Sequence, residues 1–114
     1  MSVRIDLDRL ADVTAEWATV PMLLTTDADG RPRASTVTVE WDGKQAVVRA
    51  GRRSVANAGD RPLVSLLWPA APGEPHALLV DGDSDGVDAE AGTVRFRPSG
   101  AILHVIERGG CGPG

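Results

Sequence analysis

The sequence predicts an all-β domain, folded as a closed or nearly closed β-barrel with short helices. Three observations carry this prediction. After one helical segment near the start, the spacing of apolar residues changes from a helical period to a period of two. About six or seven short strands follow, and tight turns rich in glycine, proline and aspartate separate them. The chain has 114 residues, the length of one domain, so these strands have to share a single core.

The first predicted element is a helix over residues 7–19. Asp6 precedes it and is a good cap for the first turn, whereas Pro21 ends it because proline cannot continue a helix. The residues that recur there at helical spacing are Leu7, Leu10, Thr14 and Trp17.

Two hairpins are predicted next. A strand over 22–26 runs into a turn at 27–32 that contains an Asp-Gly step, and Asp42-Gly43 forms a second such turn. Between the turns lies one alternating strand. Its first face carries Ser35, Val37, Val39 and Trp41, and its second face carries Ala34, Thr36, Thr38 and Glu40.

The rest of the chain alternates between strands and loops. Residues 63–68 are apolar on both faces, which is typical of a strand buried inside a barrel. The other strands are expected at 45–50, 76–80, 93–97 and 101–106. The loops are expected at 51–54 before a short helix, at the proline-rich 69–75, at the acidic 81–86 and at the turn 98–100. We expect one domain over residues 1–108 and a flexible tail over 109–114.

Composition excludes several classes of function. The formal net charge is −4, whereas nucleic acids and anionic membranes favour basic partners. The only cysteine, Cys111, cannot form an internal disulfide, as expected in a reducing compartment. No signal peptide and no apolar stretch of about 20 residues is visible. We therefore expect a soluble cytoplasmic protein that binds neither nucleic acid nor membrane.

The strongest candidate site is the basic turn Gly51-Arg52-Arg53-Ser54 at the beginning of the short helix. A helix N-terminus offers unpaired N–H groups and the positive end of the helix dipole, which together favour a phosphate. Two guanidinium groups and a hydroxyl add charge-assisted hydrogen bonds. Arg49 precedes the turn and can face the same way. The alternative is that Arg52 and Arg53 are solvated surface residues and that Ser54 only caps the helix.

Several segments in order resemble the flavin-binding split barrels of the pyridoxamine-phosphate-oxidase-like family. They are Thr25-Thr26, Asp29-Gly30-Arg31-Pro32-Arg33-Ala34-Ser35-Thr36-Val37, the Arg-Arg-Ser turn with Asn57, the segment from Arg61 to Pro69, and the segment from Arg97 to His104. The resemblance extends from about residue 7 to residue 106.

The resemblance implies a homodimer that holds FMN, or the deazaflavin F420, between its subunits and acts as an oxidoreductase on a small molecule. It assigns the cofactor phosphate to Arg52, Arg53 and Ser54 together with Ser35 and Thr36. It places Trp68 beside the flavin ring or the dimer interface. In such proteins the flavin carries the hydride, and the protein contributes orientation and electrostatics.

The chain also departs from the oxidases of this family. It has Ser35 where they carry an arginine, and Ser54 or Val55 where they carry a lysine, and it lacks their C-terminal substrate segment. Oxidation of vitamin B6 is therefore not expected. The alternative function is a non-catalytic split barrel that binds a small ligand or nothing, and heme bound through a histidine also stays open.

A metal site is a weaker hypothesis. Asp81, Asp83, Asp85 and Gly86 match the opening of a calcium loop, but Gly92 occupies the position of its bidentate glutamate. A solvated hairpin loop explains the acidic residues better. A structural zinc site needs four ligands, and the histidines and cysteine of this chain are only His76, His104 and Cys111. Because His104 alternates with Ile102 and Ile106, we expect it to face a pocket or a polar partner.

Overall fold

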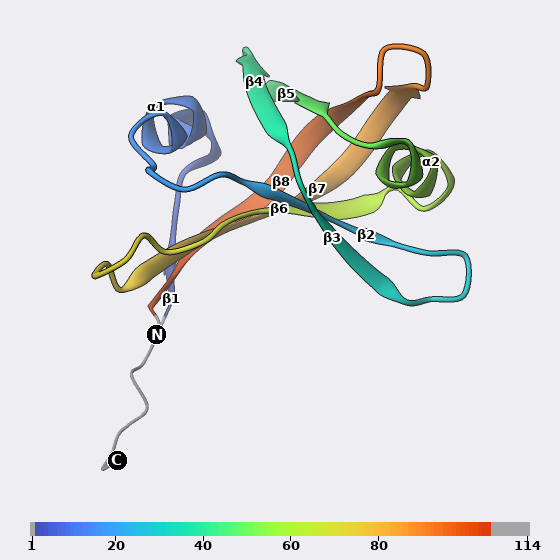
Figure 1. Ribbon diagram of the computed structural model, residues 1–114. Helices are drawn as coiled ribbons and strands as arrows, with labels where there is room; N and C mark the ends of the chain where they lie inside the picture. The colour runs from blue at the N-terminus through green and yellow to red at the C-terminus, as the bar shows by residue number, and fades with distance from the viewer. Residues whose placement is uncertain (1, 106–114) are drawn as a thin grey trace.

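The computed structural model describes residues 2–105, and they form one curled sheet with two short helices (Figure 1). The sheet has eight strands in the order β3-β2-β6-β7-β8-β5-β4, and β1 pairs with β8 outside this path. The strands are β1 (Ser2–Arg4), β2 (Met22–Thr26), β3 (Pro32–Thr36), β4 (Thr38–Asp42), β5 (Gln45–Arg49), β6 (Leu63–Trp68), β7 (His76–Asp88) and β8 (Thr93–Val105). The prediction of an all-β barrel with short helices is confirmed.

The two ends of the sheet are consecutive in the chain. β3 and β4 form opposite ends of the strand order, yet only Val37 separates them. The predicted single strand over 34–41 therefore changes partner at Val37, since β3 pairs with β2 and β4 pairs with β5. The main-chain N–H of Val37 donates to the carbonyl of Pro21, and its side chain is buried. The predicted faces of this segment are correct, and the bend at Val37 lets the sheet curl into a half-barrel.

β7 and β8 form one long hairpin, which corrects two predictions. The acidic residues 81–86 lie inside β7 rather than in a loop, and the predicted turn at 98–100 is part of β8. Asp81 pairs with Gly100 and Gly82 pairs with Pro98, so the pairing skips Ser99. Ser99 is therefore the extra residue of a β-bulge. A proline is tolerated there because a bulge interrupts the ladder of hydrogen bonds.

The first helix is shorter than predicted. A 3-10 turn, η1 (Leu7–Arg9), leads into α1 (Leu10–Ala15), whereas the sequence predicted one helix over 7–19. The predicted cap is confirmed, because the carboxylate of Asp6 accepts a hydrogen bond from the N–H of Asp8 at 3.0 Å. The second helix, α2 (Arg52–Asp60), packs at the other end of the sheet (Figure 1).

The core lies on one face of the sheet and includes residues of both helices. Its largest fully buried side chains are Phe96, Leu10, Leu23, Leu66, Leu78, Val48, Val80 and Val94. β6 is not buried on both faces as predicted. Val64, Leu66 and Trp68 point into the core, whereas Leu63 is 77% exposed on the other face.

Candidate functional site

The helix that carries the predicted phosphate site begins about three residues earlier than expected, at Arg52. Gly51 is the N-cap, with no side chain capping the helix, so Arg52, Arg53 and Ser54 form the first turn of α2 rather than a loop before it. Their N–H groups have no helical acceptor, because the first four N–H groups of any helix lack one. The helix end therefore offers donors to an anion, as the sequence predicted, but Ser54 is not its cap.

Ser54 instead contacts Ser35, the second predicted ligand, from the neighbouring sheet. Their hydroxyl oxygens lie 2.8 Å apart, and Ser54 is 7% exposed. In such a pair one O–H donates to the other oxygen, and the accepting serine keeps its own proton. The pair can therefore present one further O–H donor next to the start of α2.

A polar network that sequence reasoning missed fastens α2 to the hairpin of β2 and β3. Asn57, which is 6% exposed, donates to Asp27 at 2.8 Å and to Thr25 at 3.3 Å. Its own amide oxygen accepts from Arg61 at 3.2 Å, and Arg61 also donates to the carbonyl of Thr26 at 2.6 Å. The available signal was a polar residue between Val55 and Ala58 on the buried side of a short helix. This network holds Ser54 against Ser35.

The carboxylate of Asp27 is paired with a positive charge. Arg33 donates to this carboxylate at 2.6 Å. This bond is the main reason that the pKa of Asp27 lies below its ordinary value of 3.8, and the bond from Asn57 and the charge of Arg53 act in the same direction. Asp27 in turn raises the pKa of Arg33. Arg53 thus lies close enough to the β2–β3 hairpin to influence its carboxylate.

Arg52 and Arg53 diverge. Both are exposed, and neither forms an ion pair with another residue in the range 2–105. Arg52 lines a hollow of about 210 Å³ between α2 and the end of the β7–β8 hairpin, which Val87 also lines. Successive helical residues point about 100° apart, so only Arg53 is directed toward Asp27. The structure does not bring Arg52 to the serine pair.

Two connected hollows lie near the start of α2, and neither Ser35 nor Ser54 is among their wall residues. The first, about 310 Å³, is lined by Thr36, Arg49 and Gly51. The second, about 540 Å³, is lined by Trp17, Trp41 and Trp68. The two share the wall residues Val20, Val37 and Thr38. Thr36 and Arg49 thus lie near Gly51, the N-cap of α2, and Trp68 lines the adjoining hollow while remaining 3% exposed.

The other candidate residues are dispersed or differently used. Asp83 and Asp85 form ion pairs with Arg97, and Asp81 accepts a hydrogen bond from Ser65 at 2.6 Å. Within residues 2–105 there is no group of three or more His, Cys, Asp or Glu that could hold a metal ion. The same residues contain no helix long and apolar enough to cross a membrane.

The expectation that His104 faces a pocket or a polar partner is wrong. His104 is exposed on β8, whereas His76 lines a hollow next to Trp17. Cys111, Ile106 and the predicted tail over 109–114 lie outside the described residues.

Solved structures with a similar backbone have names that refer to three cofactors. An F420 reductase matches with a TM-score of 0.62 at 17% identity, over 75% of this chain and 90% of that one. A heme-binding protein from Mycobacterium smegmatis matches with a TM-score of 0.58 at 20% identity, over 90% and 52%. An FAD-binding protein from Mesorhizobium loti matches with a TM-score of 0.55 at 12% identity, over 91% and 99%. The fold is therefore the split barrel found among flavin- and deazaflavin-binding proteins.

Curated sequences show a nearer relationship, although no family model matches the chain. The uncharacterized protein Mb0449c of Mycobacterium bovis is 36% identical over 120 residues, covering 89% of this chain and 80% of the relative. The uncharacterized protein MT0457 of Mycobacterium tuberculosis matches with the same identity and coverage. The chain belongs to the family of these two mycobacterial proteins, and its fold is a split barrel.

Proposed function

We propose that this protein binds FMN or the deazaflavin F420 and serves as an oxidoreductase for a small molecule. The observation that carries the proposal is the serine pair at the first turn of α2, together with two connected hollows that begin at Gly51, the N-cap of the same helix. The similarity of the backbone to an F420 reductase and to an FAD-binding protein supports the same cofactor class.

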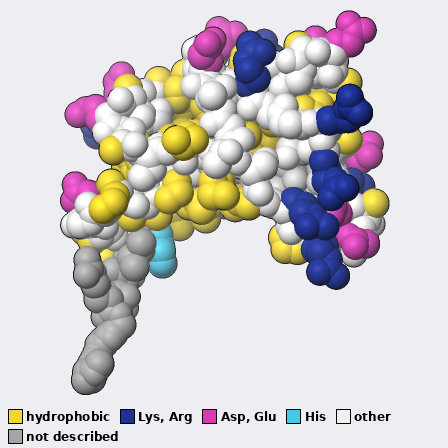
Figure 2. All heavy atoms as spheres, viewed as in Figure 1, with side chains coloured by type: hydrophobic (Ala, Val, Ile, Leu, Met, Phe, Trp, Pro, Cys, Tyr) yellow, Lys and Arg dark blue, Asp and Glu magenta, His cyan; other side chains and the backbone are white. Residues whose placement is uncertain are grey.

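The residues at this position fit a phosphate. The N–H groups of the first turn of α2 and the free O–H of the pair Ser35 and Ser54 are donors, as an anion requires. The hydroxyl of Thr36 lies on the opposite face of β3 and lines the first hollow. Arg49 and Arg53 supply positive charge, and Arg52 adds to the field from the far side of the helix. Figure 2 shows Lys and Arg side chains gathered on the side of the molecule where α2 and the β2–β3 hairpin lie.

The adjoining hollow fits a flat, largely apolar ring. Its volume of about 540 Å³ is within the range typical of small-molecule pockets, and its walls are mainly apolar and aromatic. Trp41 is held there by a hydrogen bond from its indole N–H to Thr14 at 2.8 Å. A bound flavin or deazaflavin would supply the hydride chemistry. The chain itself would orient the ring with fixed aromatic side chains and exclude water from it.

We further propose that the protein is a homodimer that pairs through the outer face of its sheet. The strand register places Met22, Leu67, Leu79 and Ile102 in one row across β2, β6, β7 and β8. Each keeps part of its side chain exposed, and Figure 2 shows hydrophobic side chains in a band over the sheet. A second copy offers the same uncharged row, so pairing would remove apolar surface from water on both subunits.

Titration with FMN and with F420 tests the cofactor proposal. We expect bound flavin to absorb at roughly 450 nm and to raise the melting temperature, because a ligand that binds only the folded state stabilises it. Replacing both Arg52→Ala and Arg53→Ala should weaken binding by about ten- to a hundredfold. Arg53→Ala alone should account for most of that loss. The exposed Arg31→Ala is the matched control.

Unchanged affinity in the double arginine variant would overturn the assignment of the phosphate site. If neither cofactor binds the unaltered protein, the alternative of a non-catalytic split barrel replaces the proposal. The dimer is tested separately by sedimentation of Leu67→Asp, which should be monomeric, beside the control Val87→Asp on the β7–β8 hairpin. An unaltered protein that sediments as a monomer would refute the dimer.

A further inference from the structure

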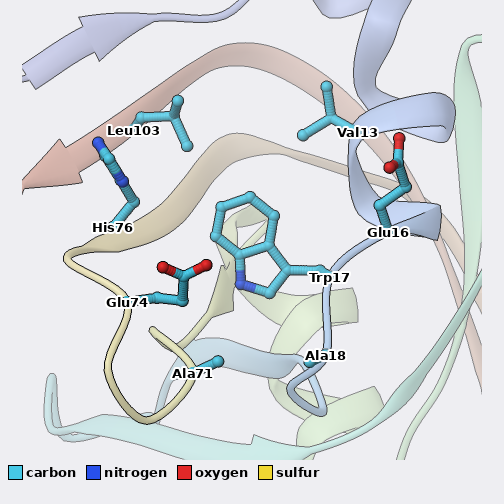
Figure 3. A pocket seen from close by; sticks show the side chains of 8 residues that line it. All are labelled: Val13, Glu16, Trp17, Ala18, Ala71, Glu74, His76 and Leu103. Atoms are coloured by element: carbon cyan, nitrogen blue, oxygen red, sulfur yellow. The ribbon is translucent and has the colours of Figure 1, made fainter.

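A further hollow of about 410 Å³ lies between α1, the loop before β7 and the C-terminal half of β8 (Figure 3). It shares Trp17 and Ala18 with the hollow lined by the three tryptophans. Its walls include Trp17, the apolar side chains of Val13 and Leu103, and the carboxylates of Glu16 and Glu74. His76 also lines it, and among residues 2–105 no lysine or arginine does. We call it the acidic hollow. Its volume is within the range of small-molecule pockets, and its charge is opposite to that of the site proposed for the cofactor phosphate.

The indole of Trp17 is fixed as one wall. Its N–H donates to the carbonyl of Pro69 at 3.0 Å, and the hydroxyl of Thr19 donates to the same carbonyl at 2.5 Å. These bonds hold the loop before β7 against the chain that follows α1. Because the indole N–H is already engaged, the ring offers a ligand its π-system rather than a hydrogen bond. An indole ring is the aromatic side chain that attracts cations most strongly.

Glu16 and Glu74 come from two different segments and line the hollow on different sides of this ring. Figure 3 shows Glu74 next to the indole on one side and Glu16 on the other. Neither carboxylate forms an ion pair with another residue in the described part of the chain. The acids of β7 differ, because Asp83 and Asp85 are paired with Arg97. The acidic hollow therefore combines negative charge, an aromatic wall and apolar walls.

We propose that the acidic hollow binds a small organic cation, either a protonated amine or a quaternary ammonium group, with an apolar body. The ammonium group lies over Trp17 between Glu16 and Glu74, and the apolar body packs on Val13 and Leu103. Neither a neutral nor an anionic ligand would use the two carboxylates, because they repel anions and give a neutral molecule no charge to pair with. This site shares the wall residue Trp17 with the hollow proposed for the cofactor ring, but its acidic and apolar walls are other residues, so the proposal requires no bound flavin.

The test compares choline with its neutral carbon isostere, 3,3-dimethyl-1-butanol, on the full-length protein. Binding is followed through the indole N–H signals in a ¹H–¹⁵N correlation spectrum, in which Trp17→Phe assigns the Trp17 signal. We expect choline to shift that signal and the neutral isostere to bind at least about tenfold more weakly, since only choline has a charge to interact with the ring and the carboxylates.

Variants of the two acids complete the test. Replacing both Glu16→Gln and Glu74→Gln keeps side-chain size and should weaken choline binding by about five- to tenfold. Glu90→Gln, at an exposed position after β7, is the matched control and should leave it unchanged. Equal binding of choline and its isostere, unchanged binding in the double variant, or shifts confined to the other two tryptophans would each overturn the proposal. Choline binding in the arginine variants of α2 should be unaffected, which separates this site from the cofactor site.

Discussion

Asn57→Ala tests whether the network beneath α2 holds the candidate site in place. Asn57 is 6% exposed and makes three hydrogen bonds, to Thr25, Asp27 and Arg61. Two of these partners are charged, and a buried hydrogen bond to a charged group contributes about 1.5–3 kcal/mol to the free energy of unfolding. Because Asp27 and Arg61 retain some access to water, we expect a net loss of about 2–4 kcal/mol in the free energy of unfolding.

Urea denaturation followed by tryptophan fluorescence measures this loss, at one fixed protein concentration because dimerisation would shift the midpoint. With a slope of about 1–1.5 kcal/mol per molar urea, the midpoint should fall by roughly 2 M. The variant should also bind the cofactor more weakly, because the position of Ser54 against Ser35 depends on the attachment of α2 to the hairpin.

Gln45→Ala is the matched control. Gln45 is also an amide bonded to a carboxylate and to an arginine, Asp85 at 3.1 Å and Arg95 at 3.2 Å, but both bonds are exposed. Because water can replace these exposed bonds, Gln45→Ala should lower the free energy of unfolding by less than about 0.5 kcal/mol. Equal losses in the two variants would refute the reasoning, because burial is the main difference between the two amides.

Two further predictions concern the same hairpin and the bulge. Asp27 has a lowered pKa in the folded protein, so the unfolded chain binds its proton more readily and the stabilisation from Asp27 is lost as the pH falls below about 3.8. At pH 7, the urea midpoint of Asp27→Asn should therefore be lower than that of the unaltered protein. At pH 3, the difference between the two midpoints should be smaller. The same difference at both pH values would contradict this reasoning. Gly82→Ala should lower the free energy of unfolding by roughly 2–3 kcal/mol in the same urea assay. The reason is that a Cβ at this position would collide with the carbonyl of Arg97 and the ring of Phe96. Gly100→Ala, whose Cβ would meet open space, is its control, and an equal loss there would show that the collision is not the cause.

Much of the architecture followed from local patterns. The strand over 22–26, the two Asp-Gly turns and the cap at Asp6 were all predicted, because each depends on residues close together in the chain. The same holds for the faces of the segment 34–41, since side chains alternate along any strand. A short helix after the third predicted strand was also expected, although it begins at Arg52 rather than after a loop over 51–54.

The errors arose where distant strands decide the structure. The acidic residues of β7 look like a loop in sequence, but Ser65 and Arg97 on neighbouring strands pair with them and make an extended strand favourable. The apparent turn at 98–100 became a bulge because β7 provides a partner on both sides of it.

The sequence by itself determined that this protein is a small all-β barrel with donors and positive charge at the start of a short helix. Only the tertiary structure decided how those groups are used. It turned Arg52 away from the serine pair, because one helical step changes direction by about 100°, and it buried Asn57 as the link between α2 and the sheet. It also brought Glu16 and Glu74 to the ring of Trp17, although 58 positions separate the two acids in the chain (74 − 16). Chain folding, rather than local pattern, sets such distances.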